Sequence, residues 1–239
     1  MVLRKLDYGE ADRIYTLLTR EHGKLGALAR GVRKPASRLG PALELYGRVD
    51  VLLAHGRSLD IVTQVERVAG PRLAAEVERT AHAALIAEVA DRVCEDRHVV
   101  DGVFELTVLA LEELAREAQP RRASAYFLGQ ALELLGFGPE LARCASCGAP
   151  LPEAPAPFAP PAGGFLCAGC TLPGMIPVSV PAIKVLRLVA AGEIDLYRRL
   201  RLPDAVLAEV EGVLEAQLEH HLDRRLKSLA FLRQMRHMA

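Results

Sequence analysis

The sequence predicts a multidomain α+β protein: a small β-barrel comes first, a helical bundle follows, and a four-cysteine element interrupts the bundle. Three observations predict this fold. β-type alternation is confined to the first part of the chain, helical spacing of apolar residues follows it, and two close cysteine pairs flank a proline-rich interval. With 239 residues and 51% hydrophobic content, the chain has ample material for packed cores. We therefore expect domains at residues 1–68, 69–139, 140–175 and 176–239.

Short apolar segments with period-two alternation fill the first of these ranges. The expected strands are residues 1–6, 13–19, 24–30, 45–54 and 59–65, separated by turn residues such as glycine. Five strands in so short a length are too few for a sandwich. They suit a small closed barrel of the OB type.

Apolar residues recur at helical spacing after Pro71. One stripe runs from Leu73 to Val93, a second from Phe104 to Leu114 and a third from Ala125 to Leu135. Later helices are expected to begin near Pro181 and at Pro203-Asp204, with a last one ending near Arg236. We interpret the stripes as the packed core of a helical bundle.

Two C-x2-C pairs, Cys144 with Cys147 and Cys167 with Cys170, are separated by nineteen residues. This spacing is typical of a tetrahedral zinc site, and Gly148 permits the positive φ that such a turn needs. Four thiolates leave no open coordination position, so one structural zinc ion is expected. Redox-active cysteines and an empty, degenerate site are the alternatives.

Six prolines lie between Cys147 and Cys167, so we expect neither a helix nor a central strand in that interval. The lone Cys94 is expected to be a small buried apolar residue.

The chain carries 30 basic and 30 acidic residues, but they are unevenly distributed. Residues 1–68 hold 12 Lys or Arg and 8 Asp or Glu, a net charge of +4, whereas residues 71–139 hold 7 and 12, a net charge of −5. A polyanion is therefore expected to bind the first domain. Because neither a signal peptide nor a membrane span is evident, we expect a cytoplasmic protein.

The segment from His22 to Leu43 contains five cations and no acidic residue. Alternation along its strand puts Lys24 and Arg30 on one face, and a turn at Gly31 and Pro35 follows. We expect these cations to hold nucleic-acid phosphates without reading bases. The expected phosphate-binding residues are Arg13, Lys24, Arg30, Arg33, Lys34 and Arg38.

Motifs for nucleotide-driven or hydrolytic chemistry are absent. The sequence has no G-x4-G-K-[ST], G-x-G-x-x-G, H-E-x-x-H or G-x-S-x-G motif, and its acidic residues are scattered along helical segments. We therefore expect no catalytic residue and no enzyme activity. A zinc-containing nuclease and an RNA-binding zinc-ribbon protein remain alternatives.

Several stretches resemble the bacterial RecO recombination-mediator family. They are Leu6 to Ile14 with Thr16 to Thr19, then Gly23 to Lys34, and finally His220 to Phe231. The cysteine quartet falls where zinc-carrying members of that family have theirs. The resemblance spans essentially the whole chain.

The resemblance implies an N-terminal OB domain, a helical domain and a zinc element. It also implies a DNA repair protein, associated with the nucleoid, that binds single- and double-stranded DNA, anneals complementary strands and acts with RecR. Such a protein helps RecA load on DNA coated by single-stranded DNA-binding protein. It is expected to bind no membrane and to have no small-molecule substrate. The acidic tail of single-stranded DNA-binding protein would need an apolar pocket with a basic rim. Candidate rim residues are Arg121, Arg122, Arg224, Arg225 and Lys227.

Overall fold

The computed structural model describes residues 1–70, 76–222 and 225–238. These residues form two compact units, one of Met1–Ser124 with Leu226–Ala239 and one of Ala125–Arg225, apart from the gaps just given. Arg224 therefore lies outside the described residues, as does Leu73.

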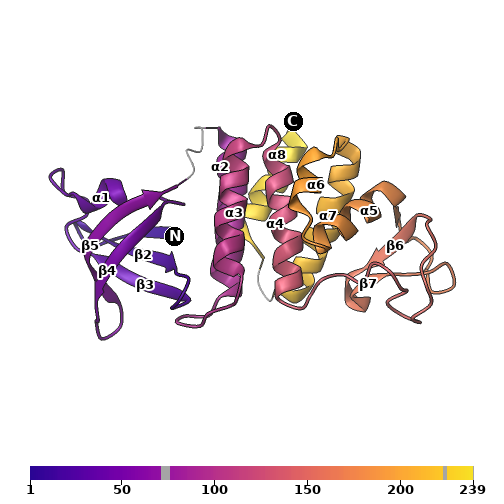
Figure 1. The fold of residues 1–239 in the computed structure, drawn as a ribbon, viewed down its shortest axis with the longest axis horizontal. Helices are drawn as coiled ribbons and strands as arrows, with labels where there is room; N and C mark the ends of the chain where they lie inside the picture. Colours follow the sequence, from indigo (N-terminus) through magenta and orange to yellow (C-terminus); the bar gives the residue numbers. More distant parts are fainter. Residues whose placement is uncertain (71–75, 223–224, 239) are drawn as a thin grey trace. The chain divides into compact units, whose positions relative to one another are not determined.

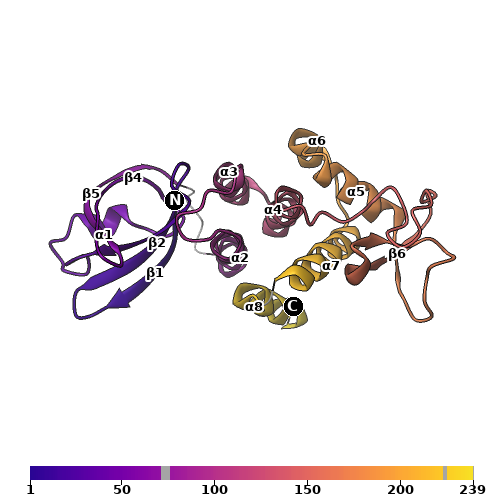
Figure 2. The ribbon, with the colours of Figure 1, turned by 90° about the horizontal axis from the view of Figure 1, so that it is seen from below.

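The first unit begins with a five-stranded sheet in the order β1-β2-β3-β5-β4 (Figures 1 and 2). All neighbouring strands are antiparallel except β3 and β5, which are parallel. A short helix, α1 (Leu39–Ala42), lies in the β3–β4 connection. The strands are β1 (Val2–Tyr8), β2 (Asp12–Leu18), β3 (Lys24–Ala29), β4 (Arg48–Ala54) and β5 (Asp60–Ala69).

The five expected strands are confirmed, but the closed barrel is not. The edge strands β1 and β4 share no ladder. Two backbone hydrogen bonds instead join β1 to the segment before β4, from Val2 N to Gly47 O (3.0 Å) and from Tyr46 N to Val2 O (2.8 Å). The interior is apolar, because alternate residues of each strand point inward. Its buried residues are Val2, Tyr15, Leu17, Ala27, Ala29, Val32, Leu43 and Val62.

Three helices complete the first unit: α2 (Val77–Val93), α3 (Val103–Arg116) and α8 (Lys227–Met238). The N-terminus of α8 is capped from another helix. The Glu88 carboxylate on α2 accepts from Lys227 N (3.1 Å), Ser228 N (2.8 Å) and Ser228 Oγ (2.6 Å). These bonds satisfy backbone donors that a helix start leaves without intrahelical partners. They tie α8 to α2 across 139 residues of sequence.

The boundary between the units falls within α4 (Pro120–Leu134), and the second unit continues with α5 (Val180–Ala190), α6 (Ile194–Arg199) and α7 (Asp204–His221). Ser179 caps α5 by accepting from Ala182 N. Most residues of the apolar stripes are buried on helix faces, but Val77 at the start of α2 is 65% exposed. The short helix α6 was not expected from the sequence. Among the described residues, no helix combines the length and the apolar character needed to cross a membrane.

The proline-rich interval corrects one expectation, because it contains a strand at the centre of a small sheet. The order is β7-β6-β8, with β6 (Ala156–Ala159), β7 (Gly164–Phe165) and β8 (Pro177–Val178), and a 3-10 turn, η1 (Pro160–Ala162), follows β6. Pro157 is tolerated in β6 because it contributes a carbonyl, which accepts from Leu166 N at 3.0 Å. The ladders are only two residues long, so a missing N–H costs little.

Candidate nucleic-acid interface and metal centre

The loop after β3 is held mainly by its backbone groups, and one of its cationic side chains, Arg33, adds a bond to Gly9 O at 3.4 Å. Gly31, with φ 63°, donates its N–H to Asp12 Oδ1 (2.7 Å), and Arg33 N donates to Ala11 O (2.9 Å). Ser37 N bonds back to Lys34 O at 2.9 Å. The loop is therefore fixed against the β1–β2 turn by contacts that do not use the side chains of Arg30, Lys34 and Arg38.

Two of the expected phosphate-binding arginines converge on one carboxylate. Arg13 Nε lies 2.7 Å from Asp7 Oδ1, and Arg33 Nε lies 3.6 Å from Asp7 Oδ2. The hydrogen bond from Arg13, followed by the nearby charge of Arg33, lowers the pKa of Asp7 below its usual range. Asp7 thus holds the two guanidinium groups together and partly neutralises them.

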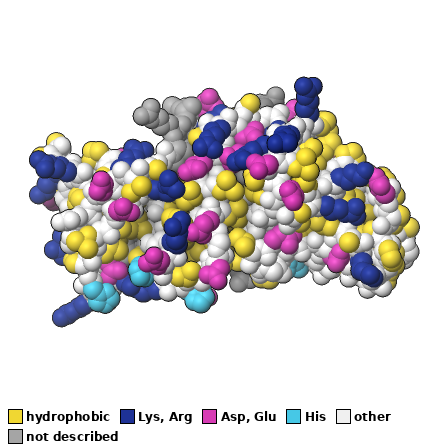
Figure 3. Space-filling view, in the orientation of Figure 1, with side chains coloured by type: hydrophobic (Ala, Val, Ile, Leu, Met, Phe, Trp, Pro, Cys, Tyr) yellow, Lys and Arg dark blue, Asp and Glu magenta, His cyan; other side chains and the backbone are white. Residues whose placement is uncertain are grey.

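Three further cations of the loop have no acidic partner. Arg30, Lys34 and Arg38 are exposed, and none of them makes an ion pair with a residue that the structure describes. Basic and acidic side chains are interspersed over the face drawn in Figure 3. Attraction to a polyanion therefore depends on local groups such as these three and not on the overall charge.

Lys24 lies apart from the other five. Its side chain is only 16% exposed, and Nζ lies 3.1 Å from Asp91 Oδ1 and donates to Asp91 O at 2.6 Å. Lys24 is on the outward face of β3, as alternation predicted, whereas Arg30 lies just beyond the last residue of the strand, Ala29. The end of that face at Lys24 is occupied by α2, however, so we leave Lys24 out of the candidate interface.

A groove of about 860 Å³ lies within the first unit, between β1, α2 and α8. Leu3, Ala84 and Phe231 are among its apolar lining residues. Of the rim residues suggested by the sequence, Lys227 lines this groove, whereas Arg122 lies beside Glu117 at 3.9 Å and is buried. The cations that line it are Arg4, Lys5, Arg92 and Lys227.

Sequence reasoning missed three of these four cations, Arg4, Lys5 and Arg92. They come from a strand and a helix far apart in the chain, and no local motif connects them. Only the packing of β1 beside α2 brings them to one groove.

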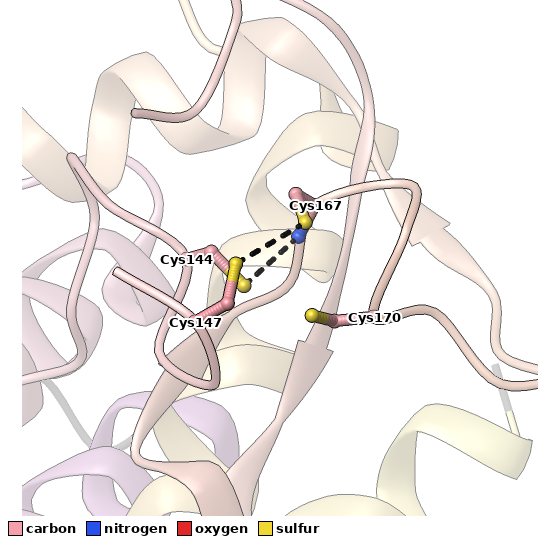
Figure 4. Close-up of side chains that lie close together, drawn as sticks. All are labelled: Cys144, Cys147, Cys167 and Cys170. Carbon is pink, nitrogen blue, oxygen red and sulfur yellow. Dashed lines mark hydrogen bonds between the residues drawn. The ribbon is translucent and has the colours of Figure 1, made fainter. Parts of the chain in front are cut away.

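The four cysteines of the two pairs meet in the second unit (Figure 4). Their sulfur atoms all lie within 4.8 Å of one another, and Cys147 Sγ is 3.7 Å from Cys167 Sγ. Ligands 2.3 Å from a tetrahedral zinc ion are about 3.8 Å apart, so this arrangement fits zinc. The four-cysteine cluster expected from the sequence is therefore confirmed, and it can hold a metal ion.

Two tight turns aim the sulfurs. Gly148, with φ 74°, donates to Cys144 O (2.8 Å), and Cys170 N donates to Cys167 O (3.0 Å). Backbone N–H groups also point at the first sulfur: Cys167 N donates to Cys144 Sγ at 3.3 Å. This bond is the main cause that lowers the pKa of Cys144 to about 6, which favours the thiolate that zinc binds.

Comparison with known proteins agrees with the geometry. The family model described as "Recombination protein O N terminal" matches residues 1–71, and the model described as "Recombination protein O C terminal" matches residues 74–230. The chain belongs to the RecO family.

Relatives named DNA repair protein RecO match over nearly the whole chain. The protein of Desulforudis audaxviator (strain MP104C) is 38% identical over 240 residues, covering 98% of this chain and 95% of its own length. The protein of Roseiflexus sp. (strain RS-1) is 39% identical, covering 100% and 85%. The protein of Bifidobacterium adolescentis is 37% identical, covering 97% and 96%. This RecO family member is therefore a DNA repair protein.

Proposed function

We propose that this RecO family protein is a recombination mediator that binds single- and double-stranded DNA by its phosphates and anneals complementary strands. The observation that carries the proposal is the loop after β3. Its backbone is fixed, and its cations Arg30, Lys34 and Arg38 are exposed and have no acidic partner in the described part of the chain. Arg13 and Arg33 lie beside it around Asp7.

Annealing in this mechanism needs no bond-making residue. Cations that hold one strand by its phosphates reduce the repulsion that a second strand meets, and base pairing supplies the free energy. If three to five phosphates are neutralised, a plot of the logarithm of the single-strand binding constant against the logarithm of the salt concentration is expected to have a slope of about −2 to −3.5. We call this slope the salt slope. We accordingly propose that the protein is not an enzyme. The closed four-cysteine set supports this, because it has no open position for a catalytic water.

Zinc at the cysteine quartet would close the loop between the two pairs and serve as a structural ion. Cys144, Cys147, Cys167 and Cys170 would hold it as thiolates. A zinc ion supplies the cross-link that this proline-rich segment cannot obtain from a large apolar core.

We further propose that the protein works with RecR and with single-stranded DNA-binding protein, and so helps RecA load in the cytoplasm at the nucleoid. The groove in the first unit supports one of these contacts. Its apolar lining suits the aromatic and apolar residues of an acidic protein tail. Lys227 suits an acidic residue of the tail, while the other three cations already lie beside carboxylates: Arg4 beside Asp91, Lys5 beside Glu44 and Arg92 beside Glu88.

The decisive experiment is annealing of complementary oligonucleotides coated with single-stranded DNA-binding protein, without ATP. The double variant Lys34→Glu, Arg38→Glu is expected to lose annealing. The matched control is Arg199→Glu, Arg201→Glu, which makes the same charge change at exposed residues of the second unit. Equal losses in both double variants would show that only net charge matters.

Two further experiments test the alternative functions. Incubation of labelled DNA with magnesium or manganese tests for a nuclease, and competition with RNA tests for an RNA-binding protein.

A further inference from the structure

The outward face of the N-terminal sheet carries an apolar row that crosses all five strands. Leu6 pairs with Ile14, Ile14 with Leu28, Leu28 with Ile61, and Ile61 with Ala54. Directly paired residues point to the same side of a sheet. Because the adjacent residues Ala27, Ala29 and Val62 point into the core, this row faces away from it. The outer row is defined as Leu6, Ile14, Leu28, Ile61 and Ala54.

The outer row is open to solvent in part. Leu6 is 60% exposed, Ala54 is exposed, and the three residues between them are half-buried. An antiparallel sheet that faces water normally presents polar residues on that side. A continuous apolar row there indicates a surface that a ligand covers.

An aromatic ring stands at one end of this face. Tyr8, two residues after Leu6 on the same side of β1, is 55% exposed, whereas Tyr15 and Tyr46 are buried. Since residues 1–70 contain no other Phe, Tyr or Trp, Tyr8 is the one side chain of these three types that this part of the chain presents to solvent.

The loop that carries the cations is bonded to the β1–β2 turn, which begins directly after Tyr8. Tyr8 pairs with Asp12, whose carboxylate accepts from Gly31 N, next to Arg30. On the other side, Arg33 donates through Nη1 to the carbonyl of Gly9 (3.4 Å), the residue after Tyr8. A flat ring beside exposed cations is the combination that single-stranded nucleic acids bind, with bases on the ring and phosphates on the cations.

We propose that Tyr8 stacks on an unpaired base of single-stranded DNA and that the outer row receives the neighbouring base. The inference rests on the proposed DNA-binding function and adds a contact that duplex DNA cannot make, since paired bases are hidden in the stack. Stacking on Tyr8 needs no base-edge hydrogen bond, so the contact is independent of sequence. A newly annealed duplex would lose this contact, which favours its release.

Charge argues for a nucleic acid on this face and against a second copy of the chain. A symmetric pairing of two such faces would bring both copies of Arg30, Lys34 and Arg38 to one interface. These cations have no acidic partner among the described residues, and like charges brought together oppose association. A strand of DNA instead supplies a phosphate for each cation.

Binding to two probes of equal length tests the proposal: a thymidine oligonucleotide and a deoxyribose-phosphate chain without bases. The wild type is expected to bind the thymidine oligomer more tightly. Tyr8→Ala is expected to weaken that binding roughly 5- to 150-fold, the effect of one stacked base, and to leave the affinity for the base-free chain unchanged. Tyr8→Phe keeps the ring and is expected to bind like the wild type. Leu6→Gln, in the outer row, is expected to cause a smaller loss.

A fluorescence measurement gives an independent readout, because the chain contains no Trp. The thymidine oligomer, and not the base-free chain, is expected to quench Tyr8→Trp. Leu172→Trp, at an exposed position of the second unit, is the control and is expected to stay unquenched.

Several results would overturn the proposal. Base stacking at Tyr8 is excluded if Tyr8→Ala binds both probes as the wild type does. It is also excluded if this variant loses affinity for both probes equally. A loss of self-association in sedimentation, with DNA binding intact, assigns the face to a second copy. If the wild type binds neither probe, the DNA-binding function itself is wrong, and the base contact falls with it.

Discussion

The ammonium nitrogen of Lys24 lies 3.1 Å from a carboxylate oxygen of Asp91, so a cation from the basic segment joins β3 to α2. Lys24→Met removes the charge and keeps most of the side-chain length. We expect a loss of about 1–3 kcal/mol in the free energy of unfolding, because the largely buried Asp91 carboxylate loses its closest partner. Urea denaturation measures this loss. The salt slope of DNA binding is expected to stay unchanged.

Lys34→Met is the matched control for that variant and is expected to show the opposite pattern. Its unfolding free energy is expected to change by less than about 0.5 kcal/mol, as is usual for exposed residues. Its salt slope is expected to fall in magnitude by about 0.7, the contribution of one phosphate. If Lys24→Met also reduced the slope, Lys24 would belong to the DNA interface.

Asp7→Asn is expected to strengthen DNA binding, because Asp7 occupies Arg13 and Arg33. Two freed guanidinium groups would steepen the single-strand salt slope by up to about 1.4. Fluorescence anisotropy at several salt concentrations measures both quantities. Glu66→Gln, an equal charge change at an exposed residue of β5, is the control and is expected to have a smaller effect on affinity. Weaker binding by Asp7→Asn would mean that Asp7 positions the arginines for DNA.

Acid is expected to destabilise the first unit through His82. Burial, followed by the charges of Arg236 and Arg121, lowers the pKa of His82 to about 4, and His82 Nδ1 lies 2.7 Å from Ser124 Oγ. Between pH 6.5 and pH 4, the imidazole of His82 is protonated in the unfolded chain and neutral in the folded chain. The stability contributed by neutral His82 is therefore present above pH 6.5 and lost as the pH falls to about 4. The total loss is about 3 kcal/mol.

Urea denaturation across this pH range measures the effect. His82→Gln is expected to flatten the pH dependence between pH 6.5 and 4, whatever its own stability at neutral pH. His55→Gln, at an exposed histidine, is the control and is expected to retain the steep dependence. An unchanged curve for His82→Gln would assign the acid sensitivity to other groups.

Zinc removal is expected to affect the second unit. We expect one zinc ion per chain by elemental analysis. Chelation or Cys170→Ser is expected to open residues 148–166 to protease, because this segment has only short ladders of its own. Phosphate binding by the first unit is expected to persist. Cys94→Ser, at the buried cysteine of the first unit, is the control for zinc content. A zinc-free protein with an unchanged proteolysis pattern would refute the structural role.

Much of the fold follows from periodicity. Alternation located the five strands, and apolar stripes located α2, α3 and α4, because each pattern marks the face that the core buries. The cysteine cluster followed from spacing alone. Cysteines three positions apart within each pair need only one tight turn to face the same ion.

The remaining features depend on contacts between distant segments. Alternation put Lys24 on the outward face correctly, but it could not show that Asp91, 67 residues away, occupies that end of the face. The role of Asp7 could not be predicted for a similar reason, since the two arginines that it contacts come from β2 and from the loop after β3. The strand at Pro157 was not expected, because proline has a low propensity for central strands. A ladder of only two residues can tolerate it.

The capping of α8 by Glu88 has a consequence for how the protein is made. Because the second unit is inserted between the two segments of the first, a ribosome must translate more than a hundred residues before Lys227 and Ser228 can reach α2. Until then the face of α2 that receives α8 is uncovered. Assembly of the first unit is therefore completed late in synthesis, after the inserted unit has left the ribosome.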